Sequence, residues 1–276
     1  AMLILYGILG LVVGSFLNTV IDRVPARASF WTPPSHCPRC ERKLSPAELV
    51  PVVSYIALRG RCRTCGVRIP ARTLWVEIAT GALFAFLWWS FGPSLRLLLN
   101  TVYFSILLAI LVIDLEHKLV PNVIVLPATL LALVATPLQL IITPPIYANY
   151  GFLALFSRGN NALPLPTLSM ISQLIGGVVA FGIFFLVWII SPKGMGAGDV
   201  KLAGFVGLIT GFPGALAAVF GSFIMGGVVA LVLLATGKAT RKTAIPFAPF
   251  MVIAAFLVML YGDPLLHWYL GQWLSR

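Results

Sequence analysis

The chain has 276 residues, of which 59% are hydrophobic and only 10% are charged, and its formal net charge is +11. A typical soluble domain has about 25% charged residues, so the composition excludes an ordinary soluble globular protein. Long charge-free windows, each near the roughly 20 residues that cross a bilayer, predict an all-α polytopic membrane protein, because a segment in lipid must satisfy its own backbone hydrogen bonds.

Eight transmembrane helices are predicted from these windows. The apolar runs are continuous rather than alternating, which favours helices over a β-barrel. The first span lacks a basic n-region and is too long for an h-region, so we expect it to be a spanning helix rather than a cleavable signal peptide. The sixth and seventh spans are separated only by a weak break at "VFGS", residues 219–222. The predicted spans are 2–21, 73–91, 97–115, 122–142, 170–190, 201–217, 218–236 and 247–262.

Residues 22–72, between the first two spans, form the only sizeable hydrophilic segment. If the eight spans alternate in direction, sixteen of the nineteen Lys and Arg residues lie on the same side as this loop. The positive-inside rule then places the loop in the cytoplasm and both termini outside. Membrane topology thus explains the net positive charge, and no bound nucleic acid is needed to account for it. The alternative explanation is that the loop binds phosphate groups.

The cytoplasmic loop contains all four cysteines, in the motifs "CPRC" and "CRTCG", with 21 residues between the two pairs. Two such turns can direct four thiolates at one ion, so Cys37, Cys40, Cys62 and Cys65 predict a closed, structural Zn²⁺ site. Thiols stay reduced in the cytoplasm, and a redox-active dithiol pair is the alternative. His36 adjoins the first pair, but four thiolates already complete the site.

The chain has only eight carboxylates, and two of them fall at matching depths in the predicted membrane topology. Asp114 lies near the cytoplasmic end of the third span, and Asp199 opens the sixth span within "GMGAGDVKL". Ionisable residues at this depth are costly and usually functional. The alternative for each is a helix cap, or for Asp114 a pairing with Lys118 or His117.

Two neighbouring carboxyl groups can share one proton, so that one activates water while the other polarises a carbonyl group. This is the chemistry of an aspartyl protease, and Gly196 and Gly198 would let a substrate backbone approach the acids. Other motifs fail: "GMGAGDVK" is neither a P-loop nor a dinucleotide fingerprint, and no HExxH occurs. A proton-coupled transporter that uses Asp114 and Asp199 as a relay is the main alternative, and a non-enzymatic zinc-loop scaffold is a third.

These motifs, in this order, resemble the bacterial type IV prepilin peptidases, which carry a GxGD turn in common with other intramembrane aspartyl proteases. The similarity covers most of the chain. Ala248 and Asn122 depart from the family pattern, in which Gly and an acid are common at these positions, and the outside segment 143–169 is long. The stretches that carry the resemblance are "GSFLNTVIDRVP", the tetracysteine loop, "RTLWVEIATGALF", "DLEHKLVPN", "GMGAGDVKL" and "IPFAPFMVIAAF".

The resemblance implies an inner-membrane endopeptidase whose catalytic aspartates are Asp114 and Asp199. Its substrates would be prepilins or type II secretion pseudopilins, which have a basic cytoplasmic leader, a cleavage site after Gly and an apolar helix in the membrane. It also implies methylation of the new N-terminal residue by S-adenosylmethionine. A sulfonium favours acidic or aromatic neighbours, so Glu48, Glu77 and Tyr55 are candidates, with a structural contact as the alternative for each.

The predicted organisation therefore has three parts. Residues 1–21 form the first transmembrane helix, residues 22–72 the cytoplasmic zinc loop, and residues 73–276 the peptidase bundle. The expected cofactors are structural Zn²⁺ and S-adenosylmethionine, and the expected partners are the prepilin substrate and membrane lipid, without nucleic acid.

Overall fold

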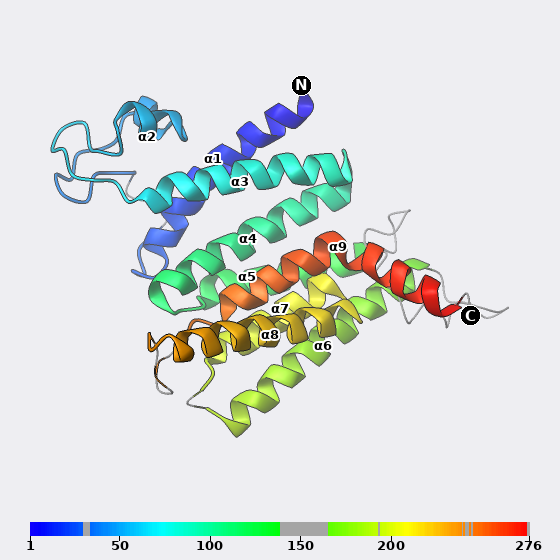
Figure 1. The fold of residues 1–276 in the computed structure, drawn as a ribbon. Helices are drawn as coiled ribbons and strands as arrows, with labels where there is room; N and C mark the ends of the chain where they lie inside the picture. Colours follow the sequence, from blue (N-terminus) through cyan, green and yellow to red (C-terminus); the bar gives the residue numbers. More distant parts are fainter. Residues whose placement is uncertain are drawn as a thin grey trace. The chain divides into compact units, whose positions relative to one another are not determined.

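The computed structural model describes residues 1–29, 34–138, 165–192, 194–238, 240, 243 and 245–274. Of residues 165, 166 and 263–274 it describes the backbone only. The chain folds as two compact units, Ala1–Ala109 and Ile110–Arg276. Throughout the described ranges the regular elements are helices, which confirms the predicted all-α class (Figure 1).

The first unit is built on two long helices that pack side by side, α1 (Met2–Arg23) and α3 (Ala71–Phe91) (Figure 1). Glycines on α1 allow this close approach, as small residues do between membrane helices. A Cβ at Gly10 would lie 2.7 Å from the carbonyl oxygen of Thr80, and one at Gly14 would lie 2.8 Å from Cα of Glu77. The connection between the two helices contains a short 3-10 helix η1 (Pro46–Leu49) and a one-turn helix α2 (Val53–Ala57). The unit also includes most of α4 (Leu95–His117).

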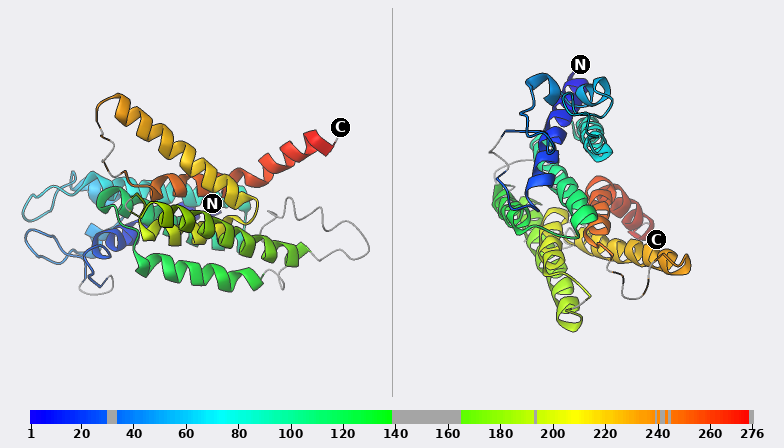
Figure 2. Two further views of the ribbon diagram at one scale, coloured as in Figure 1. Left: turned by 90° about the horizontal axis from the view of Figure 1, so that it is seen from below. Right: turned by 90° about the vertical axis from the view of Figure 1, so that its left-hand side faces the viewer.

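The second unit surrounds one short helix, α7 (Ala197–Thr210), which packs against four other helices. Nine of the fourteen residues of α7 are buried. The end of α4 belongs to this unit, and Figure 2 shows the crossing of its helices in two further views. The helices that contact α7 are α5 (Asn122–Leu138), α6 (Leu165–Ile190), α8 (Gly214–Ala235) and α9 (Ala248–Leu274).

Among the described residues a helix overlaps each of the eight predicted spans, but eight membrane spans are not confirmed. Among the described residues, five helices are long and apolar enough to cross a membrane, namely α1, α3, α4, α6 and α8. Helices α5 and α7 and the part of α9 that was assessed, Ala248–Gly262, are shorter apolar helices. Most of the predicted outside segment 143–169 lies outside the described residues.

The predicted break between the sixth and seventh spans was wrong. The structure places the break at residues 211–213, and the predicted break at "VFGS" lies inside α8, where Ser222 Oγ donates to the carbonyl of Val219 at 2.7 Å. Gly211 ends α7 with a left-handed φ of 64°, which glycine adopts at little cost. Pro213 has no N–H to continue the α7 ladder. Because the residues around this turn are apolar, the charge-free window runs through it without a signal.

Candidate functional site

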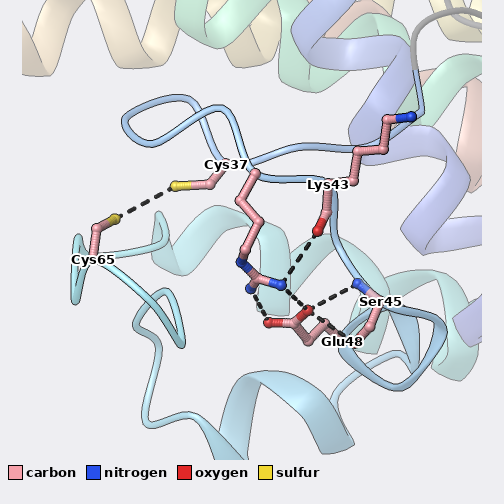
Figure 3. Close-up of polar contacts among 6 residues, drawn as sticks. Cys37, Lys43, Ser45, Glu48 and Cys65 are labelled. Carbon is pink, nitrogen blue, oxygen red and sulfur yellow. Dashed lines mark hydrogen bonds and ion pairs between the residues drawn. The ribbon is translucent and has the colours of Figure 1, made fainter.

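The four cysteines form one cluster in the connection between α1 and α3. Their sulfur atoms all lie within 4.8 Å of one another, and all four are free thiols. Figure 3 shows the side chains of Cys37 and Cys65 directed at each other, with their sulfurs 3.7 Å apart. A tetrahedral site with Zn–S bonds of about 2.3 Å has S···S edges of about 3.8 Å. The cluster therefore has the size and the donor set to hold one metal ion.

The two CxxC motifs are built as two matching knuckles. In the first, the N–H of Cys37 donates to the carbonyl of Arg42 at 3.0 Å. In the second, the N–H of Cys62 donates to the carbonyl of Val67 at 2.8 Å. Each knuckle also turns through a left-handed residue four positions after its first cysteine, Glu41 with φ 55° and Gly66 with φ 68°. The same turn geometry thus presents both pairs of thiols to one point.

Backbone N–H groups in the knuckles stabilise the thiolate form of two cysteines. The N–H groups of Cys40 and Arg39 lower the pKa of Cys37, and those of Cys65 and Thr64 lower the pKa of Cys62 to about 6. At Cys65 the N–H of Val67 acts in the same direction, but burial and the neighbouring sulfurs outweigh it and raise the pKa to about 11. A divalent cation among the four sulfurs would relieve their mutual repulsion. His36 Nδ1 donates to the carbonyl of Pro34 at 3.2 Å.

Glu48, a predicted cofactor ligand, is engaged in holding the first knuckle to η1. Arg42 donates from Nη2 to Oε1 of Glu48 at 2.6 Å and from Nη1 to Oε2 at 3.1 Å. Ser45 adds its N–H and its hydroxyl to Oε2 at 2.8 and 2.9 Å (Figure 3). Arg42, and then the Ser45 N–H, lower the pKa of Glu48 to about 2, and Glu48 in turn raises the pKa of Arg42. These contacts give Glu48 a structural role, and cofactor binding by it stays a prediction.

Glu77, the second predicted cofactor ligand, is buried on α3 and reaches back to the loop. Its Oε2 accepts the N–H of Val52 at 2.7 Å. Beside it on α1, buried Asn18 donates to the carbonyl of Thr73 at 3.0 Å, and Asn18 Oδ1 has no hydrogen-bond partner among the described residues. Tyr55 donates to the carbonyl of Ile69 at 3.3 Å within the loop. A buried carboxylate and a free acceptor are thus concentrated at one end of the α1–α3 pair.

The predicted aspartate pair lies in the second unit. Asp114, in the last turns of α4, is buried, and its Oδ2 accepts the N–H of Ala248 at 3.1 Å. Ala248 is the first residue of α9, so a helix N-terminus points at this carboxyl group. Asp199 stands in the first turn of α7, close enough to Asp114 for the two carboxyl groups to influence each other. The structure thus brings together two acids that are far apart in the sequence.

The turn that precedes Asp199 uses its two predicted glycines differently. Gly196 is exposed, and its N–H donates to Asp199 Oδ2 at 3.3 Å. Gly198 packs against the segment after α4, since a Cβ there would lie 2.8 Å from Cβ of Val120. A role in substrate approach stays a prediction for both, but Gly198 has a packing requirement of its own.

Sequence reasoning missed two contacts around this pair. The backbone N–H of Ala248 was not foreseen, although its motif "IPFAPF" was singled out and could have pointed to it. Lys201 donates to Asn122 Oδ1 at 2.9 Å and so links the start of α5 to α7. His117, considered as a partner for Asp114, instead has its Nε2 4.0 Å from Glu116.

Two stretches of the chain match the models of known protein families. Residues 8–91 match the model of the bacterial peptidase A24 N-terminal domain, and residues 101–231 match that of the type IV leader peptidase family. A Bacillus subtilis protein named "Prepilin leader peptidase/N-methyltransferase" is 31% identical over 98% of this chain and 98% of its own length. A Pseudomonas aeruginosa protein of the same name is 31% identical over 95% of this chain and 91% of its own. No solved structure matches the chain. The names of these relatives give no support to the transporter alternative.

Proposed function

The chain belongs to the type IV leader peptidase family, and from this premise we propose that it cleaves the leader peptide of prepilin-like proteins and methylates the new N-terminus. We assign the cleavage to Asp114 and Asp199. The observation that carries this assignment is the packing of the first turn of α7, which contains Asp199, against the segment that follows Asp114 and the end of α4, where a Cβ at Gly198 would lie 2.8 Å from Cβ of Val120. The buried position of Asp114 beside the N-terminus of α9 supports it.

The proposed cleavage needs only water and the two carboxyl groups. Close carboxyl groups in a site of low dielectric share one proton. The ionised carboxylate takes a proton from a water molecule as the water oxygen attacks the scissile carbonyl carbon. The protonated carboxyl group donates its proton to the carbonyl oxygen. Collapse of the tetrahedral intermediate then breaks the C–N bond as the leaving nitrogen is protonated. The Ala248 N–H would hold Asp114 in orientation during these steps.

The proposed substrate is a membrane-anchored prepilin or pseudopilin with a basic leader, cleaved after Gly at the cytoplasmic face of the inner membrane. Asp199 and its exposed neighbour Gly196 lie at the start of α7, where a peptide backbone could come close without meeting a side chain. The positive-inside distribution of Lys and Arg supports a cytoplasmic location for this end of the helices.

Two cofactors complete the proposal. Zn²⁺ would bind Cys37, Cys40, Cys62 and Cys65, where the sulfur spacing fits it, and would hold together a loop too small to fold on a core of its own. S-adenosylmethionine would supply the methyl group. Glu77 suits its cationic sulfonium better than Glu48 does, because the oxygens of Glu48 are already occupied by Arg42 and Ser45 whereas Asn18 beside Glu77 keeps a free acceptor.

Isosteric replacement of each aspartate tests the cleaving pair. Asp114→Asn and Asp199→Asn should each lower the rate of leader cleavage by about 10²–10⁴-fold, measured by the mobility of a prepilin substrate in membranes. Glu116→Gln, an exposed change in the same helix as Asp114, is the matched control and should retain activity. Thermal unfolding of all three variants shows whether the fold is kept.

Substantial cleavage by either folded aspartate variant would sink the assignment and would favour the non-enzymatic scaffold. Uptake of a labelled solute in proteoliposomes without cleavage would instead favour the transporter. For the second activity, mass spectrometry of the processed substrate should find one added methyl group. A mature N-terminus without it would remove the methyltransferase half of the proposal.

A further inference from the structure

The loop between α1 and α3 exposes apolar side chains where a soluble loop would bury them. Four of these side chains lie on η1, α2 and the turn between them, and we call them the apolar cluster. Leu49 and Val50 are 43% and 45% exposed, and Val53 and Ile56 are each 64% exposed. Helix α2 has only five residues, too few to be stable alone. Gathered apolar surface on such a segment indicates an apolar partner.

The position of the apolar cluster along α3 indicates what that partner is. Val52, in the middle of the cluster, donates its N–H to Glu77, which lies six residues after the start of α3 at Ala71. At about 1.5 Å per residue this is roughly 9 Å into a helix that is long and apolar enough to cross a membrane. The hydrogen bond therefore holds the cluster beside the first turns of a spanning helix, rather than out in the cytoplasm.

Trp75 marks the same level of α3 as a membrane interface. Its side chain is 65% exposed, two residues before Glu77. Exposed tryptophans at the ends of membrane helices typically lie among lipid headgroups. The cluster is thus held at headgroup depth by a contact to a neighbouring position on the same helix.

The backbone of the cluster is held in a strained turn at Val52. Val52 has a φ of 62°, rare for a β-branched residue, and the N–H of Val53 donates to the carbonyl of Pro51 at 2.5 Å in a γ-turn. Such turns are strained and persist only where their surroundings hold them. The Glu77 carboxylate does so here by accepting the N–H of the turn's central residue.

Basic side chains follow the cluster directly. Arg59 and Arg61, just after α2, are both exposed. Apolar residues followed by exposed arginines are the pattern of segments that lie in the interface of an anionic bilayer. The opposite charge of lipid phosphates makes a membrane, rather than a second protein surface, the partner that the segment fits.

We propose that residues 49–61 form an interfacial anchor. The apolar cluster enters the boundary between headgroups and acyl chains of an anionic membrane, and Arg59 and Arg61 bind lipid phosphates. The anchor fixes the loop against the bilayer beside α3, independently of which reaction the protein catalyses.

The test uses the full chain in nanodiscs that contain phosphatidylglycerol and phosphatidylcholine, without substrate. The photoreactive residue benzoylphenylalanine is placed at Ile56 and, as the matched control, at Thr64, which is exposed at the second knuckle. Illumination should give a lipid adduct at position 56 by mass spectrometry and none at position 64. Equal lipid labelling at both positions would overturn the anchor, as would cross-linking of position 56 to a second protein chain in place of lipid.

A second measurement tests the arginines. Hydrogen exchange of the α2 amides should be slower in discs with phosphatidylglycerol than in discs of phosphatidylcholine alone. Arg59→Gln with Arg61→Gln should remove this difference, whereas Arg39→Gln, an exposed change at the first knuckle, should leave it. Exchange that is the same in both lipids, or unaffected by the double change, would refute phosphate binding by these arginines.

Discussion

Gly176→Ala should force α6 and α7 apart and thereby displace Asp199. A Cβ at Gly176 would lie 2.5 Å from the carbonyl oxygen of Gly207 on α7, whereas ordinary van der Waals contact begins at 3.4 Å. The helices must therefore separate by about 0.9 Å, because the obstacle is backbone and cannot rotate away. This separation would also strain the two hydrogen bonds between Ser172 and Phe212, of 2.9 and 2.7 Å.

The expected magnitudes follow from this displacement. Overpacking of this kind costs about 1–3 kcal/mol, and each kcal/mol lowers the Tm of a chain of this size by about 2–4 °C. A shift of about 1 Å at a reacting group can lower the rate about 10²-fold, and Asp199 lies on the same short helix as Gly207. Leader cleavage should therefore fall more steeply than stability does.

Intrinsic tryptophan fluorescence during heating and the initial rate of leader cleavage measure the two effects. Gly182→Ala is the matched control, since it makes the same change on the same helix where a Cβ would meet nothing within 4 Å. If Gly176→Ala matched Gly182→Ala in both Tm and cleavage rate, the reasoning from close backbone contact would be refuted.

Three further predictions concern the cysteine loop. Glu41→Gly should strengthen the first knuckle and Gly66→Ala weaken the second, each by about 1 kcal/mol, because both positions are left-handed; unchanged midpoints in chelator competition would contradict this. The folded pKa of Glu48 is about 2 against an ordinary value of 4.5, so its stabilisation is complete above about pH 5 and is lost as the pH falls toward the folded value. The loop amides should be better protected from hydrogen exchange in the native protein than in Glu48→Gln, by an amount that is constant above about pH 5 and shrinks below it. A difference in protection that stays the same at every pH would contradict this prediction. In a variant with Cys37→Ser and Cys62→Ser, elemental analysis should find no zinc, against about one ion per chain in the native protein. Absence of zinc from the native protein would refute the predicted metal site.

Much of the fold was predictable because a bilayer makes hydropathy a local property of the chain. Each charge-free window contains a helix, since an apolar segment in lipid has no other way to satisfy its backbone. Charge-free windows do not, however, report where a helix stops within an apolar run. The turn of Gly211 and Pro213 therefore escaped notice, and α7 proved too short to be counted among the five spanning helices.

The candidate site divides in the same way. The spacing of the cysteines predicted a cluster that the structure contains, because each CxxC turn is a local structure. Glu48 was expected to be available for a cofactor, yet Arg42 and Ser45 occupy its oxygens. The sequence spacing of these residues does not show whether Glu48 forms an ion pair with Arg42 or binds a cofactor, since both roles need the same carboxylate.

The sequence by itself determined the helical class, the cluster of four cysteines and the candidacy of Asp114 and Asp199, because hydropathy, short-range turns and charge topology are written along the chain. Only the tertiary structure decided which groups hold these residues in place. The Ala248 N–H at Asp114 and the Glu77 carboxylate at Val52 join positions that no local pattern relates. Such contacts depend on how closely helices approach, which glycines such as Gly176 allow but do not by themselves specify.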